Sequence, residues 1–277
     1  MPELPEVETV RKTLEVQLQH PVIEQVDIFW PRILDNCTPQ QFLEALKGQQ
    51  IQDYQRIGKY LIFVLDQHYI VSHLRMEGKY YVQKADEPYD KKHTHAIITF
   101  TNGIQLRYHD TRKFGRLYLY ERNDDLMKQK AFQHCGFDVF DERCTSEYLY
   151  EKLHSRQITL KQALLDQSVM AGVGNIYADE ICFALGYDPQ IRISRLRKKD
   201  YPEMLKQARR ILGGAMKAGG TTIRSYTSSL GVDGRFQLQL KVHSRKGQPC
   251  LNCGTSIIKK TVATRGTYYC PKCQRKR

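Results

Sequence analysis

The sequence of 277 residues contains no run of about 18 consecutive apolar residues, the length that a membrane-spanning helix requires. Its N-terminus lacks the basic-then-apolar layout of a secretory signal peptide. No internal repeat and no low-complexity tract is visible, and the apolar content of 41% is typical of a folded chain. These absences argue against membrane, secreted, repeat and disordered proteins, and they predict a globular protein of the cytosol.

Acidic residues are in deficit. Asp and Glu number 30 against 43 Lys and Arg, which gives a formal net charge of +13. Such an excess favours a polyanionic partner. The cations concentrate in residues 192–199 and in the C-terminal stretch, at residues 243–246, 259–260, 265 and 272–277. A single basic run could be only a solvated face, so these runs do not identify the partner alone.

The eight cysteines divide into a scattered set and a grouped set. The scattered set is Cys37, Cys135, Cys144 and Cys182, and the grouped set is Cys250, Cys253, Cys270 and Cys273. The grouped set has the spacing C-x2-C-x16-C-x2-C, typical of a zinc ion held by four thiolates. Disulfides or a redox dithiol are the alternatives. All four positions are cysteine, so we expect one structural Zn²⁺ with no open coordination position.

The N-terminus places a proline beside carboxyl groups, because Pro2 is followed by Glu3 and Glu6. Removal of Met1, expected before a small second residue, would expose the secondary amine of Pro2. An α-amino group titrates near about 7.7–8.0 and lysine near about 10.4, so more of the terminal amine is neutral at pH 7. A neutral secondary amine can attack a sugar carbon and form an iminium. The same residues also suit an ordinary helix start, and this segment alone leaves both possibilities open.

Apolar periodicity predicts how the chain is organised. Residues 5–18 are expected to form an amphipathic helix, and short β-rich runs follow, two of them separated by the hairpin signal Asn102-Gly103. The expected strands are residues 23–29, 50–55, 60–65, 69–73, 79–82, 96–101, 104–107 and 117–120. The expected helices are residues 146–154, 159–166, 176–185 and 201–218, and residues 230–242 are expected to be strand or loop. The predicted domains are an antiparallel β-sandwich or flattened barrel (1–130), a helical domain (131–242) and a cysteine module (243–277).

Other motifs suit contact with nucleic acid. Residues 73–78 and 110–115 combine an apolar side chain with a cation at predicted loop tips, as in proteins that insert wedges into a duplex. Asn175 follows Gly172-Val173-Gly174 at a predicted helix start, where backbone N–H groups can hold a phosphate. Residues 259–267 predict a cationic hairpin with its turn at Arg265-Gly266. Taken singly, these motifs also fit core packing, an ordinary helix cap and a protein-binding zinc ribbon.

The chain closely resembles the bacterial formamidopyrimidine-DNA glycosylase family, also called 8-oxoguanine DNA glycosylase, over essentially its whole length. The motifs that carry the resemblance occur in family order: PELPEVET (2–9), GKYL (58–61), HLRMEG (73–78), DTRKFG (110–115), AGVGNIYADE (171–180), GGTT (219–222) and the four cysteines. The resemblance implies an α+β multidomain protein with an N-terminal β-sandwich, a helix-two-turns-helix domain and a C-terminal zinc finger. It also implies a bifunctional DNA glycosylase and AP lyase of base-excision repair. Such an enzyme removes oxidised purines from double-stranded DNA and cuts the strand by β,δ-elimination, and a monomer associated with the bacterial nucleoid is expected.

The resemblance also implies roles for individual residues. Pro2 would be the nucleophile, Glu3 the general acid/base and Glu6 a supporting carboxylate. The residues implied to grip the DNA backbone are Lys59, His73, Asn175 and Arg265, and those implied to fill the gap left by the flipped base are Met76, Arg112 and Phe114. Lys161 would lie in the active site or at the DNA, and residues 219–237 would cover the extruded base.

Two rival functions remain at this stage. A related endonuclease VIII-type glycosylase would act on oxidised pyrimidines, but its leader usually reads PEGPE where this chain reads PELPE. A non-catalytic zinc-ribbon DNA-binding protein would account for the charge and the cysteines. It would leave Pro2, Glu3 and the two wedge loops unexplained.

Overall fold

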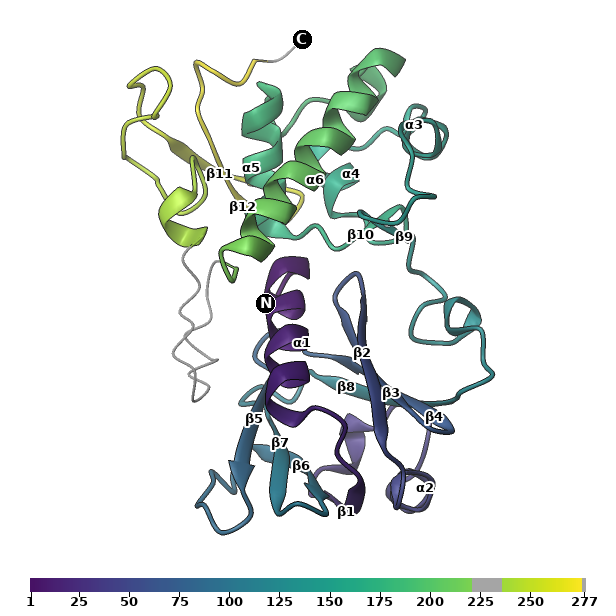
Figure 1. Cartoon of the computed structure of the whole chain (residues 1–277). Coiled ribbons are helices and arrows are strands. Elements are labelled where there is room, and N and C mark those ends of the chain that lie inside the picture. Colours follow the sequence, from purple (N-terminus) through teal and green to yellow (C-terminus); the bar gives the residue numbers. More distant parts are fainter. Residues whose placement is uncertain (221–235, 276–277) are drawn as a thin grey trace. The chain divides into compact units, whose positions relative to one another are not determined.

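The computed structural model describes residues 1–220 and 236–275, which form two compact units (Figure 1). The N-terminal unit comprises residues 1–133, and the C-terminal unit comprises residues 134–220 and 236–275. None of the described helices combines the length and the apolar character that a membrane crossing needs.

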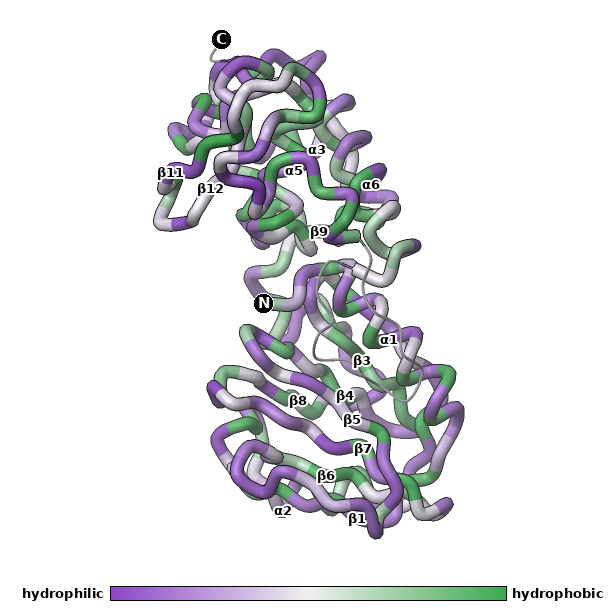
Figure 2. The backbone as a smooth tube through the Cα atoms, turned by 90° about the vertical axis from the view of Figure 1, so that its left-hand side faces the viewer, coloured by the Kyte–Doolittle hydropathy of each residue, from purple (hydrophilic) through white to green (hydrophobic). Residues whose placement is uncertain are grey.

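The N-terminal unit contains two four-stranded sheets with the strand orders β1-β6-β7-β5 and β2-β3-β4-β8, and every pairing in them is antiparallel. The strands are β1 (Ile23–Ile28), β2 (Ile51–Ile57), β3 (Tyr60–Leu65), β4 (His68–His73), β5 (Lys79–Lys84), β6 (Thr94–Phe100), β7 (Ile104–His109) and β8 (Arg116–Glu121). The helical segments are α1 (Leu4–Leu18), α2 (Pro39–Leu46) and the 3₁₀ turns η1 (Pro31–Ile33) and η2 (Leu126–Lys128). Figure 2 colours the backbone by hydropathy, and both apolar and polar residues occur along these strands. Side chains of a strand point alternately to its two faces, and the apolar ones that face inward share one core. The expected antiparallel sheets are confirmed.

Helix α1 begins where the sequence indicates. Pro5 lies in its first turn, where a missing N–H costs nothing, and the fully buried Val7 and Leu14 pack into the core shared with the sheets. Glu8 ties the helix to β2, since its carboxylate accepts hydrogen bonds from Arg11 at 3.0 Å and from Arg56 at 3.1 Å. The start of α1 is therefore anchored by apolar burial and by charge.

Helix α2 is absent from the sequence-based expectations, although its start signal is present. The Thr38 hydroxyl accepts from the Gln41 N–H at 3.2 Å, and the Gln41 side chain accepts from the Thr38 N–H at 2.9 Å. This reciprocal pair, followed by Pro39, is a capping box. The helix has 8 residues and lies between strands β1 and β2, in a part of the chain where the sequence indicates mostly strands.

The C-terminal unit joins helices to a small hairpin. Its helices are α3 (Ser146–Leu153), α4 (Leu160–Leu165), α5 (Asn175–Leu185) and α6 (Tyr201–Lys217), with 3₁₀ turns η3 (Ile193–Arg195), η4 (Lys198–Asp200) and η5 (Phe236–Gln239). Its strands are β9 (Phe137–Asp138), β10 (Met170–Ala171), β11 (Ile258–Val262) and β12 (Arg265–Tyr269). Phe183 of α5 shares an apolar cluster with Val242, Ile257 and two of the grouped cysteines, so the cysteine module packs directly on α5.

One expectation in this unit was confirmed in part, and another was wrong. Residues 236–239 form the 3₁₀ turn η5, residues 240–242 belong to no helix or strand, as expected of a loop, and the part of the 219–237 segment from 221 to 235 lies outside the described residues. The hairpin turn lies at Ala263-Thr264, with φ values of 50° and 64°, and not at Arg265-Gly266. Gly266 is instead inside β12, where an added Cβ would lie 3.0 Å from the Lys259 side chain. The absence of a side chain at Gly266 therefore leaves room for the Lys259 side chain, and this glycine is not part of the turn.

Candidate active site and nucleic-acid interface

The N-terminal residues bring two carboxyl groups together beside Pro2. Pro2 is half-buried, whereas Glu3 and Glu6 are only 3% and 5% exposed. The Glu3 N–H donates to Oε2 of Glu6 at 2.9 Å, so Glu6 fixes the backbone that carries both Pro2 and Glu3. A buried acid next to a terminal amine can exchange protons with whatever that amine attacks.

Lys59 and His73 lie near each other at one end of the β2-β3-β4 ladder. Lys59 follows Gly58 in the two-residue turn between β2 and β3, and Gly58 adopts a φ of 57° that suits glycine. Tyr60 pairs with His73 in register, and their rings meet edge to face at 4.6 Å between centroids. Both Lys59 and His73 are less than a tenth exposed.

His73 is a neutral donor in this setting. Burial lowers the pKa of His73 to about 3, with further lowering from the charges of Arg75 and Lys59. Its Nδ1 accepts a hydrogen bond from the Arg75 N–H at 3.0 Å, which leaves the ring proton on Nε2. A neutral Nε2–H can donate to an oxygen of a phosphate.

The two predicted wedge loops connect β4 to β5 and β7 to β8. Met76 lies half-buried at the tip of the first loop. In the second, the Phe114 ring is 48% exposed, and the Arg112 guanidinium carbon lies 4.8 Å from its centroid. The fully buried Asp110 holds this loop, since its carboxylate accepts from the N–H groups of Arg112 and Gly115, each at 2.9 Å.

A single tyrosine fixes how closely both loops approach the sheet. A Cβ added at Gly78 would lie 2.3 Å from the Tyr108 hydroxyl oxygen, and one added at Gly115 would lie 1.6 Å from it. Neither distance is sterically possible, so both positions require glycine. The last residue of HLRMEG and the last residue of DTRKFG therefore meet the same buried side chain.

Asn175 and Arg265 are adjacent in the C-terminal unit. Asn175 is the first residue of α5, and its Nδ2 donates to the carbonyl oxygen of Gly266 at 3.1 Å. A side-chain amide carries two hydrogens, and the start of a helix is a favourable place for an anion. Arg265 is exposed at the start of β12, next to the residue that Asn175 holds.

Lys161 is buried and bonded within the same unit. It is 0% exposed, and its ammonium group donates to Asp179 Oδ1 at 2.6 Å, to Thr267 Oγ1 at 2.7 Å and to the Gly266 carbonyl at 3.2 Å. All three ammonium hydrogens therefore have partners. This geometry favours a cross-link between α4, α5 and the hairpin over direct contact with DNA.

Asp179 and Glu180 of α5 complete the cross-link. Asp179 Oδ2 contacts His243 Nδ1 at 2.8 Å and accepts from the Tyr268 N–H at 3.1 Å. Glu180 accepts from the N–H groups of three successive residues, 241–243, at 2.9–3.0 Å. Both acids lie within the motif AGVGNIYADE, but the sequence indicates no role for them, because apart from Lys161 these partners lie more than 60 residues away.

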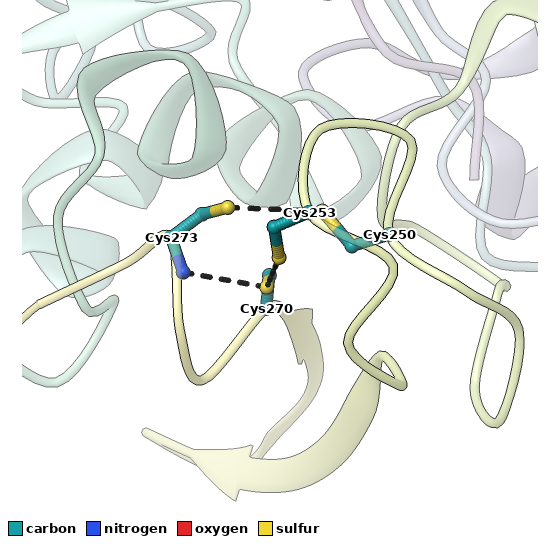
Figure 3. A group of neighbouring side chains, drawn as sticks. All are labelled: Cys250, Cys253, Cys270 and Cys273. Carbon is teal, nitrogen blue, oxygen red and sulfur yellow. Dashed lines mark hydrogen bonds between the residues drawn. The ribbon is translucent and has the colours of Figure 1, made fainter.

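The four grouped cysteines converge (Figure 3). Cys250 Sγ and Cys273 Sγ are 3.9 Å apart, and Cys253 Sγ and Cys270 Sγ are 3.5 Å apart. Zn–S bonds of about 2.3 Å in a tetrahedron place sulfurs about 3.8 Å apart. No disulfide joins them. The donor set fits one structural zinc ion, as the spacing predicted.

Comparisons with known proteins agree with this geometry. Residues 1–117 match the formamidopyrimidine-DNA glycosylase N-terminal domain, residues 135–227 match the H2TH domain of the same glycosylase, and residues 247–275 match the zinc finger found in FPG and IleRS. The chain belongs to the formamidopyrimidine-DNA glycosylase family. The formamidopyrimidine-DNA glycosylase of Bacillus licheniformis is 45% identical over the full length of both chains.

Solved structures give the same family. A mutant of the Lactococcus lactis FPG in complex with Fapy-dG-containing DNA has a TM-score of 0.92 at 37% identity, covering 99% of this chain and 100% of that one. The wild-type Lactococcus lactis FPG in complex with DNA containing an oxidised pyrimidine has a TM-score of 0.90 at 36% identity, with the same coverage. The expected fold class, a sandwich followed by a helix-two-turns-helix domain and a four-cysteine finger, is confirmed.

Proposed function

We propose that this protein is a bifunctional DNA glycosylase and AP lyase that removes oxidised purines from double-stranded DNA, with the Pro2 nitrogen as the nucleophile. The observation that carries the proposal is the position of Pro2, directly before the buried pair Glu3 and Glu6, in a chain of this family. With this substrate, the protein would act on chromosomal DNA in the bacterial cytoplasm. We propose that it acts as a monomer.

The first step exchanges one bond at the sugar for another. With Met1 removed, the Pro2 nitrogen attacks C1′ of the damaged nucleoside, and the bond between C1′ and the base breaks. The base leaves with the electron pair and takes up a proton, which balances the proton that the proline nitrogen gives up. Glu3 protonates the ring oxygen as the sugar opens, which leaves an iminium between proline and C1′. Glu3 is only 3% exposed, so its carboxyl group would exchange protons away from bulk water.

The second step uses the iminium as an electron sink. The positive nitrogen makes the C2′ proton acidic, and its loss expels the 3′ phosphate, which is β-elimination. A second elimination then expels the 5′ phosphate and leaves a one-nucleotide gap with phosphate at both ends. Glu3 can take up and return the protons of both steps, and Glu6 holds the backbone of Glu3 in place.

Backbone contacts come from both units in this proposal. Lys59 and His73 offer a cation and a neutral Nε2–H from adjacent positions of the N-terminal unit. Asn175 and Arg265 offer an amide and a guanidinium from adjacent positions of the C-terminal unit. The formal charge of +13 supports contact with phosphates.

The wedge loops account for access to the base. Met76 and Phe114 would enter the stack, and the Arg112 guanidinium, held over the Phe114 ring, would hydrogen-bond the base left opposite the gap. The cost of opening the duplex is offset by contacts of these side chains. Lys161 supports the hairpin that carries Arg265 rather than the chemistry itself.

The lesion range extends beyond one purine. The two Lactococcus lactis complexes contain Fapy-dG and an oxidised pyrimidine. We therefore expect oxidised purines to be the main substrates and some oxidised pyrimidines to be accepted.

The test is reductive trapping on a duplex that carries 8-oxoguanine opposite cytosine. Borohydride reduces an iminium to a stable amine, so the processed protein should form a covalent adduct whose mass places the sugar remnant on Pro2. The matched control is the same protein with one residue kept before Pro2. It should bind the duplex almost as well, form no adduct and leave the strand intact.

A Pro2→Gly variant, which has a primary amine in place of the secondary amine of proline, should lose most of its strand cutting while the fold and DNA binding persist. Normal cutting by the extended protein would show that the terminal amine is not the nucleophile. An adduct on a lysine would overturn the assignment in the same way.

A further inference from the structure

A second cluster of metal-binding side chains lies in the N-terminal unit, where the segment between β5 and β6 meets the end of β7. Asp90, His93 and His109 each offer one ligand atom, and these atoms lie within 4.8 Å of one another. Asp90 Oδ2 is 2.7 Å from His93 Nδ1 and 3.3 Å from His109 Nε2. Two imidazoles thus converge on the same carboxylate oxygen.

The backbone holds these side chains in place. The other carboxylate oxygen of Asp90, Oδ1, accepts from the N–H groups of Lys92 at 3.0 Å and His93 at 3.3 Å, which points Oδ2 toward the rings. His109 is the last residue of β7 and pairs with Lys79 of β5 and Thr94 of β6. The ligands come from a turn and a central strand, so little conformational freedom remains to be lost on binding.

The spacing suits a first-row transition metal ion. Bonds of about 2.0–2.1 Å to nitrogen and oxygen in a tetrahedron place ligand atoms about 3.3 Å apart. The separation of His109 Nε2 and Asp90 Oδ2, 3.3 Å, already equals this value, whereas His93 Nδ1, now 2.7 Å from Oδ2, must withdraw by about 0.6 Å. All three ligand atoms already lie within 4.8 Å of one another, so side-chain rotation is enough to complete the site.

We propose that Asp90, His93 and His109 form a second metal site that takes a divalent transition ion such as Zn²⁺ or Ni²⁺. Imidazole and carboxylate ligands suit these ions. Three protein ligands leave at least one position for water, so the ion should exchange, unlike one enclosed by four thiolates. Asp90 is 47% exposed and the two histidines are 26% and 14% exposed, so an ion from solution can reach all three.

Occupancy would stiffen a loop that matters for the enzyme. His109 is directly followed by Asp110, whose carboxylate holds the N–H groups of Arg112 and Gly115. His95 also contacts the Asp110 carbonyl oxygen at 2.7 Å. An ion bound at His109 would connect this anchor to residues 90–93 and restrain the loop that carries Arg112 and Phe114.

The experiment is calorimetric titration of the zinc-loaded, tag-free full-length protein with Ni²⁺, with zinc in solution measured in parallel. The native protein should bind one Ni²⁺ per chain without releasing zinc. His109→Gln and Asp90→Asn should each weaken this binding by at least about tenfold, because each removes one of three ligands. His134→Gln is the matched control, since His134 is exposed and lies in the other unit. It should bind Ni²⁺ like the native protein.

NMR spectra of the backbone amides would locate the bound ion. Paramagnetic Ni²⁺ should broaden the signals of residues 90–94 and 109–115 first. Absence of stoichiometric binding, equal binding by the His109→Gln variant, or release of zinc in step with Ni²⁺ uptake would each overturn the proposal. Thermal unfolding of each variant without Ni²⁺ shows whether it is folded, and a folded variant that binds normally counts against the site.

Discussion

In the N-terminal unit, the loops that carry Met76, Arg112 and Phe114 extend from a sandwich with a largely apolar core, whereas in the C-terminal unit the strand that carries Arg265 rests on buried charges and four thiolates. The stabilisation from apolar burial is not directional and depends on the area buried rather than on a particular charged partner. Buried charges are stable only while each partner is present. The two units should therefore fail under different treatments, although both are proposed to grip the same DNA.

Removing the zinc ion should have the largest effect and should be confined to the C-terminal unit. A module too small to bury a core takes its folding energy from the metal. Chelation of zinc, or Cys253→Ser, should lower the affinity for a lesion duplex by about 100-fold or more, measured by fluorescence anisotropy.

The N-terminal unit should keep its thermal transition after zinc loss. Cys37→Ser is the control, because Cys37 lies in the N-terminal unit and outside the zinc cluster. Unchanged affinity for DNA in the zinc-free protein would mean that the hairpin carrying Arg265 keeps its position without the zinc ion.

Lys161→Met should destabilise the C-terminal unit by about 3 kcal/mol, at the lower end of the range for breaking a buried ion pair. The loss is limited because Asp179 keeps His243 and the Tyr268 N–H as partners. Urea unfolding would measure it. Lys206→Met, which removes an exposed ion pair with Glu203, should cost less than about 1 kcal/mol.

This pair of variants also separates two roles for Lys161. If the role of Lys161 is structural, Lys161→Met should lower the stability of the protein and its affinity for DNA together. A variant of native stability that binds DNA but no longer cuts it would instead assign Lys161 to the chemistry.

Acid should weaken the N-terminal unit through His73. The pKa of His73 is about 3 in the folded protein against an ordinary value of 6.5, so the unfolded chain binds the proton first as the pH falls. The stability that neutral His73 contributes is complete above pH 6.5 and is lost progressively toward pH 3, by about 2 kcal/mol at pH 5.

His73→Gln should remove this part of the pH dependence of unfolding between pH 7 and pH 5. His20→Gln, which changes an exposed histidine of the same unit, should leave the slope unchanged. A His73→Gln protein with the native slope would show that His73 is not buried neutral.

The smallest effect on stability is expected at Phe114, because its side chain is half exposed. Phe114→Ala should change unfolding free energy by no more than about 0.5 kcal/mol. In single-turnover assays, Phe114→Ala should slow the release of 8-oxoguanine. It should have a smaller effect on the cutting of a duplex that contains an abasic site, because no base must be expelled there. Phe29→Ala removes a ring of similar exposure, 51%, outside the loops, and equal slowing by it would contradict the wedge role.

Much of the architecture could be predicted from short-range patterns. The helix of residues 4–18, the paired strands around Asn102-Gly103 and the four-cysteine cluster depend on periodicity, turn chemistry and spacing that lie close together in the chain. Helix α2 has a capping signal of the same short-range kind, but it lies between strands in a β-rich part of the chain, where periodicity favours strands.

Long-range polar contacts could not be predicted in this way. Nothing in the residues around Lys161 indicates that its ammonium meets Thr267, which is 106 positions away. The hairpin turn was misplaced because glycine is the usual residue at positive φ, whereas here Ala263 and Thr264 adopt it and Gly266 makes room for Lys259. The roles assigned to individual residues at the DNA stay predictions, and the experiments above address them.

The convergence of Gly78 and Gly115 on the Tyr108 hydroxyl links the evolution of the two loops. A side chain at Gly115 needs space that a smaller residue at position 108 would supply, and that vacancy would loosen the packing at Gly78 as well. A side chain at Gly78 would in addition meet the Leu74 backbone, whose carbonyl oxygen would lie 2.6 Å from the added Cβ. Relatives that carry a larger residue at position 115 should therefore also differ at position 108 and in the loop of residues 73–78.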